Sequence, residues 1–337
     1  MKPNKADINK LFYTSGNSLL QGGASIVRNR GVSITGINME IKNRIFKTKY
    51  KKVTNVYYEK NVIIDLIVLV MFSSICPIFS SGLQSKAFEQ FKASKTYIVK
   101  TGDTRFDKAI GDAMAELWKI TPTQTVDNET FESMLNDKTA SFILPVTVRS
   151  THEGQSYHYL ALINGGKKKL YQYQYDDMLA YCPINHFQNE RVNTDCYYRV
   201  RNMVESMIQA MDIVQKNDIH GMSLTIVNKL RDIYRAKAST IKSRTLLFCR
   251  ETMGDKVSES DIAKIYPYKY EICDRAKIEQ VIKDKSKDYF YFQPAITLNK
   301  SFFVFDPSNG EVVYCDYQMM GLNINKGNIE DLVKAID

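Results

Sequence analysis

The sequence predicts an α/β fold with two tandem copies of a small strand-helix-strand-helix-strand unit. Each unit has a closing β-hairpin, and a helical connector joins the two. Strand-like and helix-like segments alternate from about residue 85, and the same order returns after residue 241. The length of 337 residues also fits two domains better than one. We therefore expect a leader at 1–60, an apolar segment at 61–84, a first unit at 85–198, a connector at 199–240 and a second unit at 241–337.

In the first unit, short β-rich runs alternate with helical patterns. Phe106, Ile110 and Met114 recur at helical spacing, and Asp127 is placed to cap a second helix. An Asn-Gly-Gly turn at 164–166 favours a hairpin. The strands expected from these patterns are 96–100, 123–126, 141–148, 157–163 and 170–175.

The second unit repeats this order with little sequence identity. Its expected strands are 245–249, 269–273, 289–293, 301–305 and 311–316. Val126-Asp127 aligns with Cys273-Asp274, so Asp127 and Asp274 should cap equivalent helices. The early strands of each unit should be parallel and joined by right-handed crossovers. This order of elements resembles small α/β modules of bacterial envelope proteins, such as the amino-terminal module of TolB.

The connector carries two apolar stripes at helical spacing, at 200–214 and 226–234, with a break at His220-Gly221. The first stripe is rich in methionine. A methionine stripe can form an adaptable binding groove, but such stripes more often belong to the core, and we expect core here.

The positive charge of the chain lies in its leader. The formal net charge is +9, yet residues 1–60 hold 12 Lys and Arg and three acidic residues, and the rest of the chain holds 34 of each sign. A nucleic-acid binder carries its basic footprint on the folded part. The sequence therefore predicts no nucleic-acid partner.

Residues 62–79 form the longest apolar run, with basic residues before it and small polar residues after it. This pattern is typical of a secretory signal, with a mature protein beginning between about 80 and 90. The alternatives are an uncleaved membrane anchor and a buried core element. Residues 1–60 are too long for a signal peptide and are interpreted as non-native or disordered. The sequence thus predicts export to the periplasm or cell surface, with membrane contact only through an uncleaved 62–79.

No phosphate-binding loop, dinucleotide fingerprint, HExxH or CxxC motif occurs, so no cofactor and no metal is predicted. The weak catalytic candidates are His152, Glu153 and His158, which a hairpin would bring together as an acid/base pair or weak metal site. A solvated loop histidine and a strand histidine are the plainer alternative. Cys249 and Cys273 end neighbouring parallel strands and are the disulfide candidate.

Three alternating tyrosines suggest a binding face: Tyr171, Tyr173 and Tyr175 would point to one side of the expected strand 170–175. Such a row fits sugar rings or a partner strand, or simply a half-buried β surface. We expect a non-catalytic binding or scaffold protein of the bacterial cell envelope, with an envelope protein or a glycan as its partner. The alternatives are an exported hydrolase with a site around His158 and a membrane-anchored signalling subunit.

Overall fold

The computed structural model describes residues 65–67, 85–149, 156–173, 177–184, 194–219, 223–254, 256–296, 300–318 and 324–337. The leader at 1–60 lies outside them, and so does the first part, 80–84, of the range 80–90 in which the mature protein is expected to begin. Within the apolar run 62–79, only the strand β1 (Asp65–Ile67) is described, and it pairs in parallel with residues 147–149. No helix in the described part of the chain is long and apolar enough to cross a bilayer.

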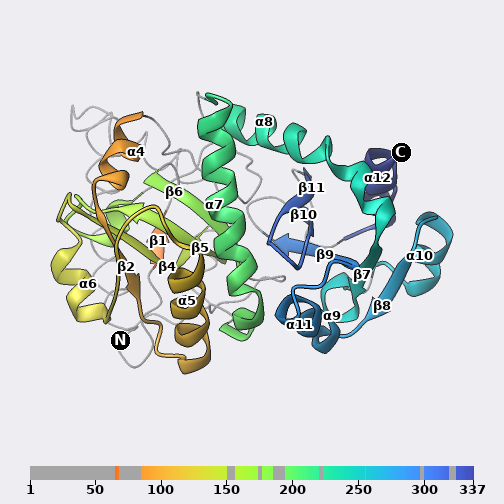
Figure 1. The fold of residues 1–337 in the computed structure, drawn as a ribbon, viewed down its shortest axis with the longest axis horizontal. Helices are drawn as coiled ribbons and strands as arrows, with labels where there is room; N and C mark the ends of the chain where they lie inside the picture. The colour runs from red at the N-terminus through yellow and green to blue at the C-terminus, as the bar shows by residue number, and fades with distance from the viewer. Residues whose placement is uncertain are drawn as a thin grey trace, which may run out of the picture. The chain divides into compact units, whose positions relative to one another are not determined.

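The first sheet has the strand order β3-β2-β4-β5-β6, with β1 beside β4 (Figure 1). β2 runs parallel to both β3 and β4, whereas β4, β5 and β6 are antiparallel. The strands are β2 (Lys95–Val99), β3 (Thr123–Val126), β4 (Ala140–Arg149), β5 (Ser156–Asn164) and β6 (Met178–Pro183). The helices around them are α4 (Ser85–Lys92), α5 (Thr104–Leu117) and α6 (Asn128–Met134).

The second sheet has the order β8-β7-β9-β10-β11, which repeats the first strand for strand. β7 is parallel to β8 and β9, and β9, β10 and β11 are antiparallel, so the tandem copies and their parallel early strands are confirmed. The strands are β7 (Thr245–Cys249), β8 (Tyr270–Cys273), β9 (Tyr289–Ile296), β10 (Lys300–Phe305) and β11 (Val312–Gln318). The helices are α9 (Arg250–Met253), α10 (Glu259–Ile265), α11 (Arg275–Lys283) and α12 (Lys326–Ile336).

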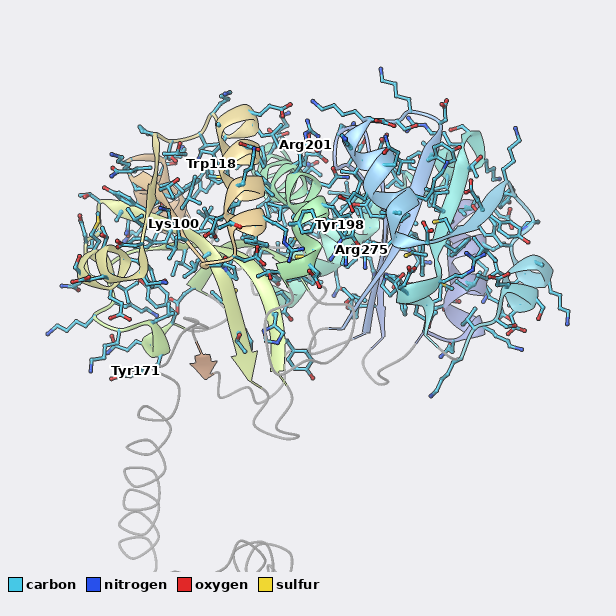
Figure 2. All side chains as sticks on the ribbon, turned by 90° about the horizontal axis from the view of Figure 1, so that it is seen from below. Lys100, Trp118, Tyr171, Tyr198, Arg201 and Arg275 are labelled. Atoms are coloured by element: carbon cyan, nitrogen blue, oxygen red, sulfur yellow. The ribbon has the colours of Figure 1, made fainter. Side chains whose placement is uncertain are left out.

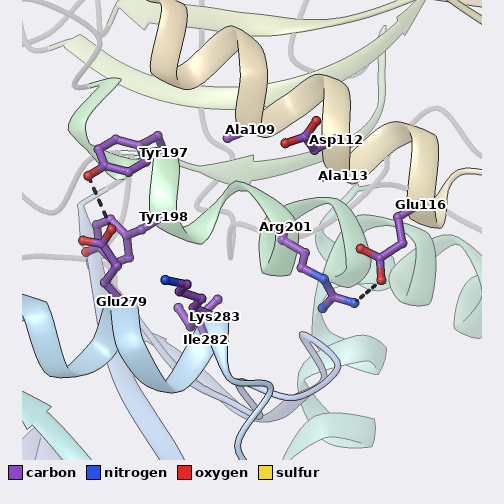
Figure 3. A pocket seen from close by; sticks show the side chains of 10 residues that line it. All are labelled: Ala109, Asp112, Ala113, Glu116, Tyr197, Tyr198, Arg201, Glu279, Ile282 and Lys283. Carbon is purple, nitrogen blue, oxygen red and sulfur yellow. Dashed lines mark hydrogen bonds and ion pairs between the residues drawn. The ribbon is translucent and has the colours of Figure 1, made fainter.

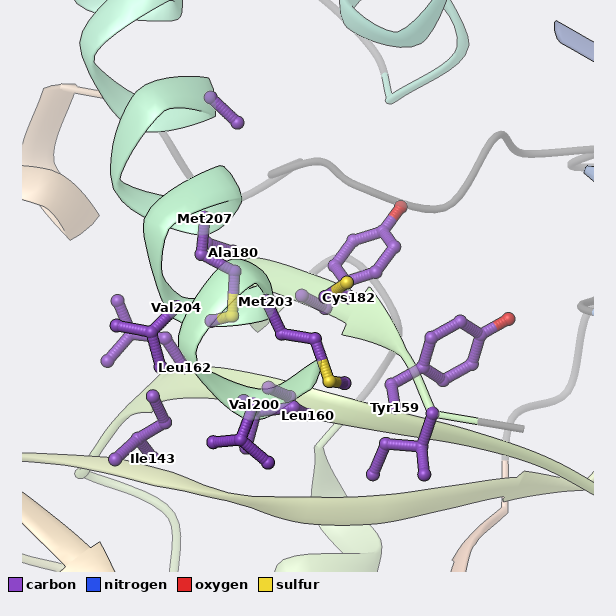
Figure 4. Close-up of a cluster of buried hydrophobic side chains, with 14 of the residues drawn as sticks. Ile143, Tyr159, Leu160, Leu162, Ala180, Cys182, Val200, Met203, Val204 and Met207 are labelled. Atoms are coloured by element: carbon purple, nitrogen blue, oxygen red, sulfur yellow. The ribbon is translucent and has the colours of Figure 1, made fainter. Parts of the chain in front are cut away.

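The described segments between the two sheets form mainly helices. The short 3-10 helix η3 (Thr194–Arg199) leads into α7 (Val200–Lys216), and α8 (Ser223–Arg235) and the 3-10 helix η4 (Ala238–Ser243) lead to β7. One face of α7 packs on the first sheet, where Met203 and Met207 lie against Leu160, Leu162 and Ala180 (Figure 4). The methionine stripe is therefore core, as the sequence predicted.

The expected strand 170–175 is wrong. Leu170–Gln172 is a single 3-10 turn, η1, and the next described strand is β6. The cause is the Asn-Gly-Gly turn at 164–166, which makes its hydrogen bonds to residues outside the expected hairpin. Gly165 donates its N–H to Ala140, and Gly166 donates to Leu135 at the end of α6. A Cβ at Gly165 would overlap the carbonyl oxygen of Asp137, so the chain is drawn toward α6 before it turns back.

Candidate functional site

His158 lies in the interior of the first sheet. Its residue is 1% exposed, and its Nδ1 is hydrogen-bonded to the Thr147 hydroxyl at 2.9 Å, across the β4–β5 pair. His152 and Glu153 lie outside the described residues. The described geometry therefore gives His158 a packed position within the sheet and leaves its grouping with the other two untested.

The tyrosines do not form one row. Tyr171 is 55% exposed on η1, whereas Tyr173 is buried and donates its hydroxyl proton to the Asn164 carbonyl at 2.7 Å. Burial raises the pKa of Tyr173 to about 12. Tyr175 lies outside the described residues. Because η1 replaces the strand, Tyr171 and Tyr173 face different environments, and the premise of a shared tyrosine face is wrong. In Figure 2, Tyr171 lies well away from Tyr198 and Arg275.

Cys249 and Cys273 lie side by side, as expected. They are direct register partners at the ends of the parallel strands β7 and β8, and both thiols are free. Cys249 donates its S–H to Oε2 of Glu251 at 3.0 Å. Burial, together with this hydrogen bond, raises the pKa of Cys249 to about 12, and burial raises that of Cys273 to about 12. The bond between them stays a prediction.

Both copies contribute to a cleft of about 270 Å³ (Figure 3). One wall belongs to α5, the opposite wall to α11 of the second copy, and the floor to η3 and the start of α7. The side chains that line it are Ala109, Asp112, Ala113, Glu116, Tyr197, Tyr198, Arg201, Glu279, Ile282 and Lys283. Sequence reasoning missed this cleft, because its residues come from three segments far apart in the chain.

Two arginine side chains lie over the rings of Tyr197 and Tyr198, the tyrosines of the cleft. The guanidinium of Arg275 lies 4.8 Å from the ring centre of Tyr198 and 5.8 Å from that of Tyr197, and Arg105 lies 5.1 Å from Tyr197. Arg275 also donates to the backbone carbonyl of Asp195 at 2.6 Å. Since Arg275 begins α11 and the tyrosines belong to η3, these contacts tie the second copy to the first.

Arg199, the last residue of η3, is a buried cation that attaches η3 to the first sheet. Arg199 is buried, and its Nη2 donates to the Ile184 carbonyl at the end of β6 at 2.7 Å. Its guanidinium lies 5.9 Å from the ring centre of Tyr198. A buried guanidinium that has hydrogen-bonded to the backbone cannot move without losing that bond, so η3 presents Tyr197 and Tyr198 from a fixed base.

An ion network closes one end of the cleft. Arg201 on α7 pairs with Glu116 on α5 at 3.1 Å and with Glu205 at 2.7 Å, and Lys285 after α11 reaches Glu116 at 2.8 Å. The hydrogen bond from Arg201, which has the larger effect, and the hydrogen bond from Lys285 lower the pKa of Glu116 to about 2. Burial raises the pKa of Glu205 to about 7, against the attraction of Arg201.

No group of three or more His, Cys, Asp or Glu side chains among the described residues is arranged to hold a metal ion. The chain matches no protein-family model, no curated protein and no solved structure at a significant level. The geometry of the described residues is therefore the basis for its proposed function.

Proposed function

We propose that the chain is an exported, non-catalytic binding or scaffold protein of the bacterial cell envelope, and that a partner protein inserts a segment into the cleft. The observation that carries the proposal is the joint construction of this cleft. α5 and η3 of the first copy and α11 of the second each supply lining side chains. A ligand in the cleft would thus touch both copies at once.

A protein segment suits the cleft better than a free small molecule. At about 270 Å³ the cleft lies just below the range of about 300–1,000 Å³ of small-molecule sites. Its lining mixes tyrosine rings with charges of both signs, namely Glu279, Lys283 and Arg201. Aromatic residues and arginine are enriched where proteins meet. A segment that inserts one or two side chains satisfies both the volume and the chemistry.

The state of the candidate reactive groups supports a non-catalytic role. His158 is enclosed in the first sheet, and a general base must reach the proton that it removes. The thiols of Cys182 and Cys196 are buried, and burial raises their pKa to about 12 and about 11, which leaves few reactive thiolates there at neutral pH.

The proposed location in the envelope depends on the apolar run at 62–79, whose cleavage would also remove β1 from the first sheet. Mass spectrometry of the protein isolated from its producing cell tests it. We expect an amino terminus between about residues 80 and 90, and a protein that retains Met1 would contradict cleavage.

Filling the cleft tests the binding site. A photoreactive amino acid in place of Lys283 captures the partner in the producing cell, and the purified partner is then titrated. Ala109→Trp places an indole in the cleft and should weaken binding at least about tenfold. The matched control is Ala115→Trp, because Ala115 is exposed on the same helix and does not line the cleft. Equal loss, or no loss, in both variants would contradict the cleft as the binding site.

His158→Asn separates the binding protein from the hydrolase. An Asn side chain places an oxygen near the position of Nδ1 and can keep the hydrogen bond to Thr147. We expect the variant to fold and to keep its cellular role. If it folds with an unchanged circular dichroism spectrum but loses that role, the hydrolase with a site around His158 replaces the binding protein.

A further inference from the structure

We infer that Cys249 and Cys273 are a reversible redox pair, which a low-molecular-weight disulfide converts from two thiols to one internal disulfide. This inference is independent of the cleft and of the partner that the cleft would bind. Such a pair needs two sulfur atoms within bonding distance, surroundings that accept both the dithiol and the disulfide, and a route by which the reagent reaches the sulfur atoms.

The strand register places the two sulfur atoms within reach. Cys249 and Cys273 are partners in the parallel pair β7–β8, and both belong to the same buried cluster of side chains. Paired strands lie about 4.7–4.9 Å apart, whereas a disulfide accepts Cα separations of about 4.4–6.8 Å. Parallel partners in register project from the same face of the sheet. The bond therefore requires side-chain rotation and little backbone movement.

The first copy shows that the fold does not need sulfur at these positions. The equivalent register pair of β2 and β3 is Val99 and Val126, also buried, at 3% and 6% exposure. Cys249 and Cys273 are exposed by 3% and 4%. Two apolar side chains thus suffice for packing in one copy, while the other copy has a dithiol in the same place.

The pair lies at the rim of the sheet. Arg250 and Glu251 directly follow Cys249, Asp274 directly follows Cys273, and all three are exposed. Glu251 accepts the S–H of Cys249 through Oε2 and the backbone N–H of Arg275 through Oε1. The exposed side chain of Glu251 is therefore in direct contact with the Cys249 thiol, and we infer that a reagent enters where this contact opens.

Oxidation of the pair takes two thiol–disulfide exchange steps. The Cys249 thiol loses its proton to solvent, and its sulfur attacks the reagent's S–S bond, which leaves a mixed disulfide and releases a thiolate that takes up a proton from solvent. The Cys273 thiol then loses its proton, and its sulfur attacks the Cys249 sulfur; the bond between Cys249 and the remaining half of the reagent breaks, and that half leaves as a thiolate that takes up a proton. Cys249 and Cys273 together lose two electrons and two protons, and one molecule of the disulfide is reduced to two thiols.

Oxidised glutathione tests the pair on the full chain. After incubation, the protein is denatured in acid, alkylated, digested without reductant and analysed by mass spectrometry. We expect one cross-linked peptide pair that contains Cys249 and Cys273, and its loss after dithiothreitol. The other described cysteines should be alkylated: Cys182, Cys196 and Cys315. The inference would be overturned if the protein is folded during the treatment but Cys249 and Cys273 are both recovered in alkylated form. A disulfide from either of them to another cysteine would also overturn it.

Two variants complete the test. The double variant C249V/C273V copies the Val99–Val126 pair, so it should fold and form no disulfide under the same treatment. Glu251→Gln removes the negative charge that helps to raise the pKa of Cys249, so oxidation should be at least several-fold faster. An unchanged or slower rate in Glu251→Gln would contradict the effect of the Glu251 charge on the Cys249 thiol, even where the disulfide forms.

Discussion

The carboxylates of Asp127 and Asp274 cap equivalent helices in the two copies. Oδ1 of Asp127 accepts the backbone N–H of Thr130 at 2.9 Å, and Oδ1 of Asp274 accepts that of Lys277 at 3.0 Å. Each aspartate has an extended backbone and directly follows the second strand of its copy. The same local interaction thus starts α6 and α11 at the same place in the fold.

Removing either cap should lower stability. We expect Asp274→Ala to lower the free energy of unfolding by about 1 kcal/mol, since one N-terminal N–H of α11 loses its acceptor. Asp127→Ala should act in the same direction. Asn at either position keeps an acceptor and should restore most of the loss. Urea titrations of the four variants measure these changes. An unchanged free energy of unfolding in Asp274→Ala would contradict the capping role of Asp274.

The sequence was sufficient for elements whose signals are local. Strand 123–126 and strand 245–249 were predicted with their observed bounds, because each is a short β-rich run between clear helix signals. The 3-10 turn at Leu170–Gln172 was missed, because it depends on the contact of Gly165 with Asp137 in another segment. The cleft was missed for the same reason. The neighbouring aromatics Tyr197-Tyr198 were its one local signal, and their arginine partners lie at 105 and 275.

Gly310 should be among the glycines that tolerate substitution least. Its φ is +64°, and a Cβ there would lie 2.6 Å from Cβ of Glu205 and 2.9 Å from the carbonyl oxygen of Asn202. Both contacts belong to α7, so the β10–β11 turn packs directly on the connector. We expect Gly310→Ala to lower the free energy of unfolding by more than about 2 kcal/mol, since backbone strain and overlap add.

Gly102 is the matched control for that substitution. Its φ is +89°, but nothing lies within 4 Å of the position that a Cβ would take. Gly102→Ala should therefore lower the free energy of unfolding by about 1 kcal/mol, through backbone strain alone. Thermal unfolding of both variants separates strain from overlap. Equal losses would mean that the turn at Gly310 moves away from α7 without cost.

Tyr171 and Tyr173 should respond differently to substitution. Tyr173→Phe loses the hydrogen bond to the Asn164 carbonyl and should cost about 1 kcal/mol of stability. Tyr171→Ser, on an exposed side chain, should leave the unfolding midpoint nearly unchanged. Because Tyr171 lies away from the cleft, it should also leave partner affinity unchanged. A loss of affinity in Tyr171→Ser would return the binding site to η1.

Glu205 should make the protein less stable as the pH rises from about 4.5 to about 7. Its carboxyl is buried against the β10–β11 turn, and Oε2 has no hydrogen-bond partner among the described residues. The ordinary pKa of 4.5 applies in the unfolded chain, and burial raises the pKa to about 7 in the folded chain. Between these values the folded state keeps a proton that the unfolded state has lost, so each step up in pH favours unfolding.

The charges that face Glu205 are Arg201, Glu116 and Lys285. Glu116 has a lowered pKa of about 2, so it titrates below this window, and the two cations stay charged throughout it. We expect the wild type to lose on the order of 2 kcal/mol between pH 4.5 and 7.5 relative to Glu205→Gln, whose side chain does not titrate. Urea titrations of both proteins at several pH values provide the comparison. Parallel profiles would show that Glu205 is ionised in the folded protein at pH 5, with Arg201 as a sufficient counter-charge.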